Sequence, residues 1–518
     1  MKKRPGCRRA GAKGIPALRV SAALVAGVLL HAGGAALQAG ELHPVLPREA
    51  QGEIPFVLDA TLFLDAQGRS EIYFVLAVPQ REVQCVPLSE GVGSCMQLEL
   101  LLTDLGPQGQ GLLERSQSLE VPCAEEDTAG PGGGEPAWRD CLVYLRAPWG
   151  RSTPAFTLRL EDRNAVRTGL LYKLKEEKRR GEVSAVSPVA DVRDGVGLSG
   201  CLFLWDFLPN GYESRSGFWI ASGEEARAGL TPHPGRFFGS RNAVLRFYLE
   251  AYGLDGDSLE VTTGITRAGV AEPLFRDVGR VKLPAAWSSL ARELDVRSLP
   301  AGSYLLTVEV ARRGSEEPVY RAAAGFQMLW RPESWMRLER EWLEEASLIL
   351  DESQLETFRS LLPGEREVME EGFWAAVDGA HGQVAGPTRL LFRERLAHAD
   401  KRFGGRVRGS QTDRGRVYVR FGEPDEVQKE LLPKERDRIA AFLHRELDEA
   451  ERSDAGSPLP MRAQDTSAYE VWTYVSWGQP LFPAAGNPAR GRPLEFVFVD
   501  KLGTGEYRLI YTNLHGDL

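Results

Sequence analysis

The sequence lacks the short motifs that mark the commonest catalytic sites. It contains no G-x-S-x-G elbow, no H-E-x-x-H pair and no phosphate-binding P-loop. Histidine is scarce, with 7 in 518 residues, and the six that follow the first 39 residues are scattered along the chain. These absences exclude the nucleophile-elbow hydrolases, the zincins and the P-loop nucleotide hydrolases. They leave His381 and His398 as the histidines open to a catalytic role.

Long hydrophobic runs are absent after residue 39, so no later segment is expected to span a bilayer. The early run, VSAALVAGVLLHAGGAAL, is short and rich in Ala and Gly, and it follows a basic stretch without acids. This pattern predicts an export signal over 1–39, cleaved after Ala39 with Ala36 as the alternative. A retained membrane anchor is the alternative interpretation. No cysteine follows the run, so a bacterial lipid anchor is not supported.

Positive charge is outnumbered by negative charge in the part of the chain that would remain after cleavage. The net charge of the whole chain is −9, and residues 1–39 hold seven Lys and Arg but no acid, so the remainder carries −16. An acidic exported protein is a poor partner for nucleic acid or anionic lipid. We therefore expect a periplasmic or extracellular protein whose contact with the membrane is limited to its export signal.

Cysteine is also scarce, with five residues left after the predicted signal. Four of them lie within one stretch of the first β-rich region, which predicts disulfides in an oxidising compartment. Three pairings are open, and we favour Cys85–Cys95 with Cys123–Cys141 because each closes a short loop. Cys201 is expected to be a buried thiol. A metal site is disfavoured because no C-x-x-C spacing is present, and we expect no cofactor.

The remaining pattern predicts a mainly β protein with an α+β C-terminal part. Short alternating strands and turn signals indicate two antiparallel β-sandwiches, and in the second Tyr304, Leu306, Val308 and Val310 share one face. From residue 331 the apolar spacing becomes helical, and Asp351 with Gln354 forms a capping-box pattern. The predicted divisions are a lead at 40–52, sandwiches at 53–188 and 189–330, a helical connector at 331–403 and an α+β domain at 404–518.

The stretch TDRGRVYVRFGEPDEV, residues 412–427, combines arginines and acids with a regular apolar alternation. Val417, Val419 and Phe421 alternate with polar or aromatic neighbours, which predicts a strand with one core face. Gly422 and Pro424 are expected to end that strand. The candidate binding residues lie along and beside it: Thr412, Asp413, Arg416, Arg420, Glu423 and Asp425.

Three interpretations of these acids are open. They can cap turns and pair with neighbouring arginines, as surface carboxylates beside turns usually do. Two of them, drawn from Asp413, Glu423, Asp425 and Glu426, can act as acid and base on a glycosidic bond. They can also hold a cation. We favour the first interpretation and assign no catalytic residue.

The same stretch, followed by YEVWTY and FVFVDKLGTGEYRLIYTN, resembles the C-terminal domain of the GWxTD family of exported bacterial proteins. No biochemical activity is established for that family. Its Gly-Trp-x-Thr-Asp motif corresponds here to Gly409, Ser410, Gln411, Thr412 and Asp413, so serine replaces the tryptophan. The resemblance covers 370–515, and Phe373, Trp374 and Asp378 match its upstream part. It implies a small α+β domain and transfers no catalytic residue.

The function that the sequence favours is protein interaction or assembly, with other envelope or secreted proteins as partners. The alternatives are a secreted hydrolase that uses the carboxylates near Asp413 and Asp425, or a carbohydrate-binding protein. A hydrolase predicts a pocket that holds two of these acids together. A carbohydrate-binding protein predicts a row of exposed aromatic side chains on one sheet.

Overall fold

The computed structural model describes most of the chain beyond residue 46. The described residues are 47–79, 82–87, 94–105, 111–122, 142–149, 155–164, 179–207, 211–227, 229–255, 258–312, 320–382, 386–405, 407–431, 468–475, 478, 480–482, 493–501 and 503–514. The predicted export signal lies outside them. Within these ranges, no helix has both the length and the apolar character needed to cross a membrane.

The chain divides into two compact units. The first comprises Met1–Arg236, Leu245–Leu294 and Tyr304–Phe326, and the second comprises Phe237–Val244, Asp295–Ser303 and Gln327–Leu518. The first unit contains nearly all of the two β-sandwiches. The second contains the helices and the C-terminal sheet. The protein is therefore mainly β with an α+β C-terminal part, as the sequence predicts.

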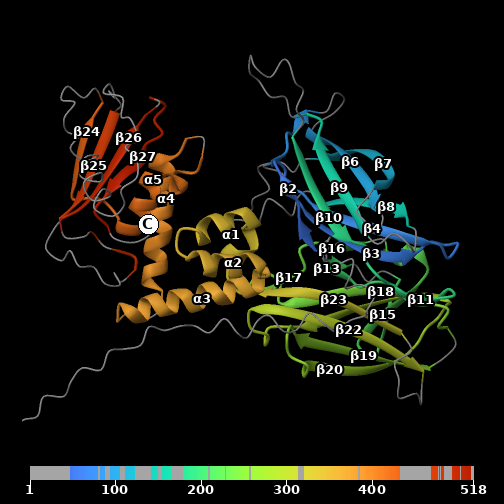
Figure 1. Cartoon of the computed structure of the whole chain (residues 1–518). Coiled ribbons are helices and arrows are strands. Elements are labelled where there is room, and N and C mark those ends of the chain that lie inside the picture. Colours follow the sequence, from blue (N-terminus) through green and yellow to red (C-terminus); the bar gives the residue numbers. More distant parts are fainter. Residues whose placement is uncertain are drawn as a thin grey trace, which may run out of the picture. The chain divides into compact units, whose positions relative to one another are not determined.

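The first sandwich packs two antiparallel sheets face to face (Figure 1). The smaller sheet has the order β1 (Arg48–Glu49), β3 (Val57–Leu64), β4 (Ser70–Ala77) and β8 (Leu142–Pro148). The larger has the order β2 (Gln51–Gly52), β10 (Arg180–Val186), β9 (Ala155–Asp162), β6 (Ser94–Leu105) and β5 (Val86–Pro87), and β7 (Gly111–Pro122) also pairs with β6. Phe74, Trp149 and Phe156 meet between the sheets with ring centroids 5.0 to 5.9 Å apart. The alternating apolar residues thus form one shared core.

The second sandwich has an eight-stranded and a five-stranded sheet. The larger has the order β11 (Asp191–Arg193), β12 (Val196–Leu198), β18 (Val244–Tyr252), β21 (Trp287–Asp295), β15 (Phe218–Ser222) and β14 (Glu213–Arg215), with β13 (Leu202–Phe207) joining β18 and β16 (Leu230–Pro232). The smaller has the order β17 (Phe237–Gly239), β23 (Tyr320–Leu329), β22 (Gly302–Arg312), β19 (Ser258–Arg267) and β20 (Pro273–Lys282). The predicted alternation in β22 is confirmed, because Tyr304, Leu306, Val308 and Val310 are all buried.

The two sandwiches share a buried contact within the first unit. Phe63 and Val75 of the first sandwich pack in one apolar cluster with Tyr248 and other residues of the second. Two arginines add ion pairs to this contact. Arg236 Nη2 lies 2.6 Å from Asp59 Oδ1, and both side chains are buried. Burial raises the pKa of Asp59, and the pull of Arg236 in the other direction is smaller.

Arg227, in the 3-10 helix Glu224–Arg227, makes the second set of contacts. Its Nε lies 2.6 Å from Glu250 Oε1, and its Nη2 donates to the carbonyl of Leu64 at 2.9 Å. The hydroxyls of Tyr248 and Tyr252 both donate to the same Glu250 carboxylate. The buried charges are therefore paired and hydrogen-bonded, as the low-dielectric interior requires.

The second unit contains a helical region that leads to a four-stranded sheet. The helical elements are a 3-10 turn (Pro332–Met336), α1 (Glu339–Ala346), α2 (Glu352–Ser360), α3 (Pro363–Ala380), α4 (Pro387–Phe403), a second 3-10 turn (Gly409–Gln411) and α5 (Asp413–Phe421). The predicted capping box of α2 is confirmed, because Asp351 Oδ1 accepts from the Gln354 backbone N–H at 2.8 Å. Gln354 Oε1 in turn accepts from the Asp351 N–H at 3.2 Å.

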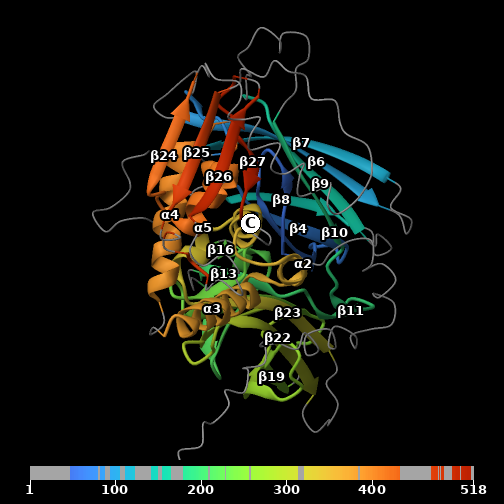
Figure 2. The same cartoon turned by 60° about the vertical axis from the view of Figure 1, so that its left-hand side comes forward.

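The C-terminal sheet is antiparallel, with the order β24 (Glu426–Glu430), β25 (Ala468–Tyr474), β26 (Leu494–Asp500) and β27 (Arg508–Thr512). Helices α4 and α5 lie alongside it in both views (Figures 1 and 2). One face of the sheet joins the helices in a core that includes Trp374, Phe392, Trp472 and Phe496. The helices and this sheet agree with the α+β C-terminal part that the sequence predicts.

The strand predicted within residues 412–421 is wrong, because this segment is helix α5. A short run in which Val417, Tyr418, Val419 and Phe421 are all buried fits a helix as well as a strand. The helix begins after Thr412, whose Oγ1 accepts from the Gly415 N–H at 3.1 Å and caps it. The first strand of this domain begins later, at Glu426.

The predicted Cys85–Cys95 disulfide is also wrong. Cys95 is a buried free thiol in β6. Cys85 therefore forms no disulfide with Cys95, and none with Cys201, which is also free. The strand register explains this, because Val86 is directly opposite Cys95 and the side chain of Cys85 points to the other face. Cys123 and Cys141 lie outside the described residues. Cys201 is a buried free thiol, as predicted, and burial raises its pKa to about 12.

Candidate functional site

The motif Gly409–Asp413 forms a tight corner between α4 and α5. A Cβ atom at Gly409 would collide with the carbonyl oxygen of Ala399, and one at Gly415 would collide with the carbonyl of Gly409. Thr412 donates its hydroxyl hydrogen to the Gly409 carbonyl at 2.7 Å while its oxygen caps α5. Ser410 is buried, and its N–H donates to Asp400 Oδ1 at 2.8 Å. The tight backbone geometry of the corner therefore accounts for the glycines and for Thr412.

Asp413 stabilises the last strand of the sheet. Its Oδ2 accepts from the Leu509 backbone N–H at 2.8 Å. Beside this bond the pairing of β26 and β27 shifts, so that Ile510 is an extra residue between Leu509 and Tyr511. Such a bulge leaves backbone groups without ladder partners. The carboxylate of Asp413 thus satisfies a donor of the edge strand β27.

A buried arginine caps the C-terminal end of α5. Arg395 of α4 donates to the carbonyls of Val419 and Arg420, both at 3.3 Å. A cation is favoured there because the last helical carbonyls carry partial negative charge. Gly422 then has φ +84°, and Tyr474 donates its hydroxyl to the Gly422 carbonyl at 2.9 Å. Burial lowers the pKa of Arg395, although nearby tyrosines act in the opposite direction.

Glu423 and Asp425 lie just beyond this end of α5, on the surface. Glu423 Oε1 accepts from Arg402 Nη1 at 3.0 Å. Burial, together with the nearby charge of Glu423, raises the pKa of Tyr418. Asp425 Oδ2 accepts from the Val475 backbone N–H at 2.6 Å, just after β25 ends. Asp425 therefore binds the backbone just after β25, and Glu423 pairs with Arg402 of α4 instead of an arginine within 412–427.

The two arginines of the predicted site lie on α5. Arg416 is exposed. Arg420 is half-buried, with its guanidinium 5.9 Å from the ring centroids of Phe421 and Phe482. The helix thus separates the candidate residues, with Asp413 at one end and Glu423 beyond the other. Its ends are about 12 Å apart, whereas a glycosidase pair needs about 5 to 10 Å.

Glu470 of β25 is a charged residue that the sequence interpretation missed. Its side chain is buried, 2.8 Å from Lys429 Nζ and 3.2 Å from Arg414 Nη1, and Trp472 Nε1 donates to it at 3.2 Å. Burial disfavours its charged form, but Lys429 and Arg414 outweigh burial, so the pKa of Glu470 is lowered. The alternation in YEVWTY places Glu470 on the face of Trp472, which was the signal available in the sequence.

The two histidines open to a catalytic role have structural contacts. His381 follows α3, and its Nε2 lies 3.1 Å from the Leu481 carbonyl oxygen. His398 is exposed on α4 and stacks on the ring of Tyr418, with centroids 4.6 Å apart. The described residues contain no group of three or more His, Cys, Asp or Glu that could hold a metal ion.

The aromatic side chains do not form the exposed row that carbohydrate binding predicts, as far as the described ranges extend. Trp149 and Trp205 are buried, and Trp138 lies outside the described residues. Tyr144 is the one aromatic among the exposed large apolar side chains of those ranges, and it stacks on Tyr73 at 6.1 Å.

Comparison with known proteins leaves the family open. No family model matches the chain, and no curated protein matches it. Among solved structures it is similar to a red sea bream transglutaminase, with 10% identity over 55% of this chain and 32% of that one, at a TM-score of 0.14.

Two further solved structures are similar at the same level. One is a tetra-tandem repeat from the extending region of a large adhesion protein, with 12% identity over 53% of this chain and 50% of that one, at a TM-score of 0.15. The other is native alpha-2-macroglobulin from E. coli, with 10% identity over 57% of this chain and 17% of that one, at a TM-score of 0.15. The chain spans no more than half of any of the three, and scores this low carry no argument about function.

Proposed function

We propose that this chain is a non-enzymatic exported protein that binds or assembles other proteins in the periplasm or outside the cell. We include in the proposal that its C-terminal domain is of the GWxTD type. The proposal is supported by the contacts that the candidate acids make within the chain. Asp413, Glu423 and Asp425 bind backbone N–H groups or an arginine of the chain itself. Acids engaged in this way favour a scaffold over a catalyst.

The edge strand β20 provides a surface for this role. It is the last strand of the five-stranded sheet, and Leu274 and Val278 are 53% and 45% exposed. The β14–β15 turn occupies the other half of the strand, where Ser216 Oγ donates to the Arg280 carbonyl at 2.7 Å. An edge strand with exposed apolar side chains can accept an extended segment of another protein. We place the partner segment along Pro273–Val278.

Site-specific crosslinking tests this surface. A photoreactive residue is placed at Val278, and in a matched control at Val189, which is 81% exposed but lies outside the sheet edge. The expected result is a discrete crosslinked protein from position 278 alone, lost when Leu274→Asp is added. Equal crosslinking from both positions, or crosslinking that survives Leu274→Asp, would contradict the assignment to β20.

A thermal-unfolding screen tests the non-enzymatic part of the proposal. The chain without residues 1–39 is heated with calcium, other divalent cations, EDTA, glycans and peptides, since a ligand of the folded state raises the melting temperature. We expect no shift from metals or glycans. A shift that disappears in Glu423→Ala or Asp425→Ala would make the ends of α5 a ligand site and overturn the proposal.

A further inference from the structure

Five charged side chains of alternating sign meet where α1, α3 and α4 come together. In order of contact they are Arg389, Glu370, Arg337, Glu345 and Arg393, and we call this set the five-charge chain. Arg337 lies between two carboxylates, with Nη1 2.8 Å from Glu370 and Nη2 2.9 Å from Glu345. Arg389 lies 3.2 Å from Glu370, and Arg393 lies 3.1 Å from Glu345. The five-charge chain thus connects three helices and the segment before α1.

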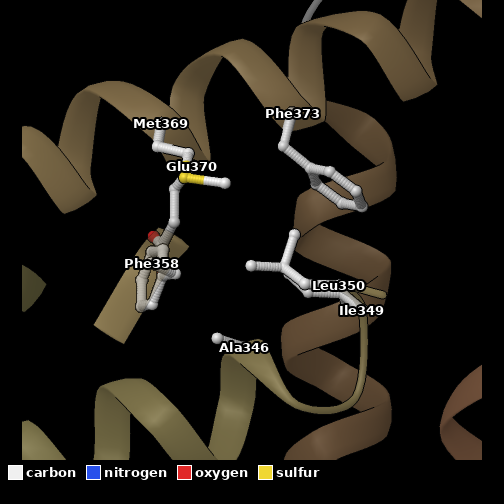
Figure 3. Close-up of a pocket in the computed structure, with 7 residues that line it drawn as sticks. All are labelled: Ala346, Ile349, Leu350, Phe358, Met369, Glu370 and Phe373. Carbon is white, nitrogen blue, oxygen red and sulfur yellow. The ribbon is translucent and has the colours of Figure 1, made fainter. Parts of the chain in front are cut away.

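Two members of the five-charge chain, Glu370 and Arg337, have apolar neighbours. Glu370 is the charged member of a notch lined otherwise by Ala346, Ile349, Leu350, Phe358, Met369 and Phe373, which has no room for a water molecule (Figure 3). The guanidinium of Arg337 lies 4.7 Å from the ring centroid of Trp342. The side chains of Arg337 and Glu345 are only 7% and 11% exposed. Charges in such a place are poorly screened by solvent.

Glu345 is the carboxylate of the five-charge chain that lies between Arg337 and Arg393. Burial raises its pKa to about 7, with Arg337 acting against this and Glu370 adding to it. The other charged groups that face it are Arg393 of α4, Arg408 and Glu341. Burial also raises the pKa of Glu370.

We propose that the five-charge chain makes the junction of α1, α3 and α4 respond to pH, with proton uptake by Glu345 stabilising the junction and proton release loosening it. A neutral Glu345 no longer bears the cost of a buried charge. Glu370 still holds Arg337, and Arg393, which is 31% exposed, can turn to solvent. The junction lies within the second unit, between β23 and the C-terminal sheet in the sequence.

The sign of the effect follows from linkage. The pKa of Glu345 is higher in the folded chain than its ordinary value of 4.5, so the folded state binds this proton more tightly. The stabilisation is complete below about pH 4.5 and is lost as the pH rises through about 7. This direction is opposite to that of carboxylates with lowered pKa values, such as Glu470.

Hydrogen–deuterium exchange of the whole chain tests the proposal. Protection of the α1 amides, corrected for the intrinsic pH dependence of exchange, is expected to rise about tenfold from pH 8 to pH 6. In Glu345→Gln the protection should be independent of pH. The matched control is Glu344→Gln on the same helix, where Glu344 is 36% exposed and pairs with Arg408 at 3.2 Å; this variant should keep the wild-type pH dependence.

A second variant keeps the test decisive if Glu345→Gln does not fold. Removing a cation in Arg393→Gln should raise the pKa of Glu345 further and move the midpoint of the protection change to higher pH. Wild-type protection that does not change between pH 8 and pH 6 would overturn the proposal. So would an unchanged pH dependence in Glu345→Gln, or an unmoved midpoint in Arg393→Gln.

Discussion

Thr412, Asp413 and Asp425 each direct a side-chain oxygen to a backbone N–H of the chain itself. At the scale of single residues, the conspicuous stretch at 412–427 is therefore explained by backbone geometry. Gly422 belongs to the same set, because its φ of +84° lies in the region where residues with a Cβ are strained. A Cβ there would also lie 2.8 Å from Arg395 Nη2.

We expect Gly422→Ala to lower the free energy of unfolding by about 1–3 kcal/mol, because it combines backbone strain with a contact against the buried arginine. Urea unfolding followed by circular dichroism measures the change. The matched control is Gly372→Ala in the middle of α3, where a Cβ meets no atom within 4 Å. That substitution should raise stability by about 0.5–1 kcal/mol. Equal effects at the two positions would contradict the assignment.

At the scale of elements, α5 shows where sequence interpretation fails. Its apolar residues alternate like those of a strand, and the information that decides for a helix lies in α4 and the sheet, which bury both sides of the segment. The helical connector was predictable because its helical apolar spacing continues over a long stretch. The β25 and β26 strands were predictable because their patterns match the period of a strand alone. The capping box of α2 was predictable for another reason, because Asp351 and Gln354 lie within four residues of sequence.

Charged contacts between elements could not be read from the sequence. Glu470 meets Arg414 and Lys429 because β25 pairs with β24 and α5 contacts β27, and neither relation is encoded locally. The same holds for the five-charge chain, whose members come from α1, α3, α4 and the segment before α1. Composition predicts the number of charges but not which of them are buried together.

Glu470→Gln should lower stability at pH 7 by about 1–3 kcal/mol, because Arg414 and Lys429 lose a buried anion. The pKa of Glu470 is lowered in the folded chain, so its contribution is present above its ordinary value and is lost as the pH falls through the folded one. The difference from wild type should therefore shrink in acid. Denaturant unfolding between pH 3 and pH 8 tests this, with the exposed Glu426→Gln as control. A difference that is constant across this range would speak against the assigned pKa direction.

At the scale of the whole molecule, the two sandwiches are joined within the first unit by buried charge as well as by apolar contact. Asp59 of β3 and Arg236 are 177 residues apart in the chain, yet they form a buried pair at 2.6 Å. Such a pair favours one arrangement of the sandwiches, because any other leaves a charge without its partner.

Asp59→Ala should lower the free energy of unfolding of the first unit by about 3–5 kcal/mol, since it leaves Arg236 buried without its anion. The double variant with Arg236→Met should regain much of this loss, because both charges are gone. Calorimetry of the four members of the cycle provides the measurement. The surface pair Asp65–Arg69 is the control, where Asp65→Asn should cost much less than Asp59→Ala. No recovery in the double variant would show that the pair is not a coupled unit.

Among the described residues, the two buried free thiols, Cys95 and Cys201, can report on unfolding of the protein. Cys95 lies in β6 of the first sandwich and Cys201 at the start of the second, and both are free. A thiol-reactive label can reach either sulfur only when its surroundings open, and peptide mass spectrometry distinguishes the two sites. Simultaneous labelling in rising denaturant would mean that the sandwiches open as one cooperative body. Labelling of one before the other would mean that the sandwiches open separately.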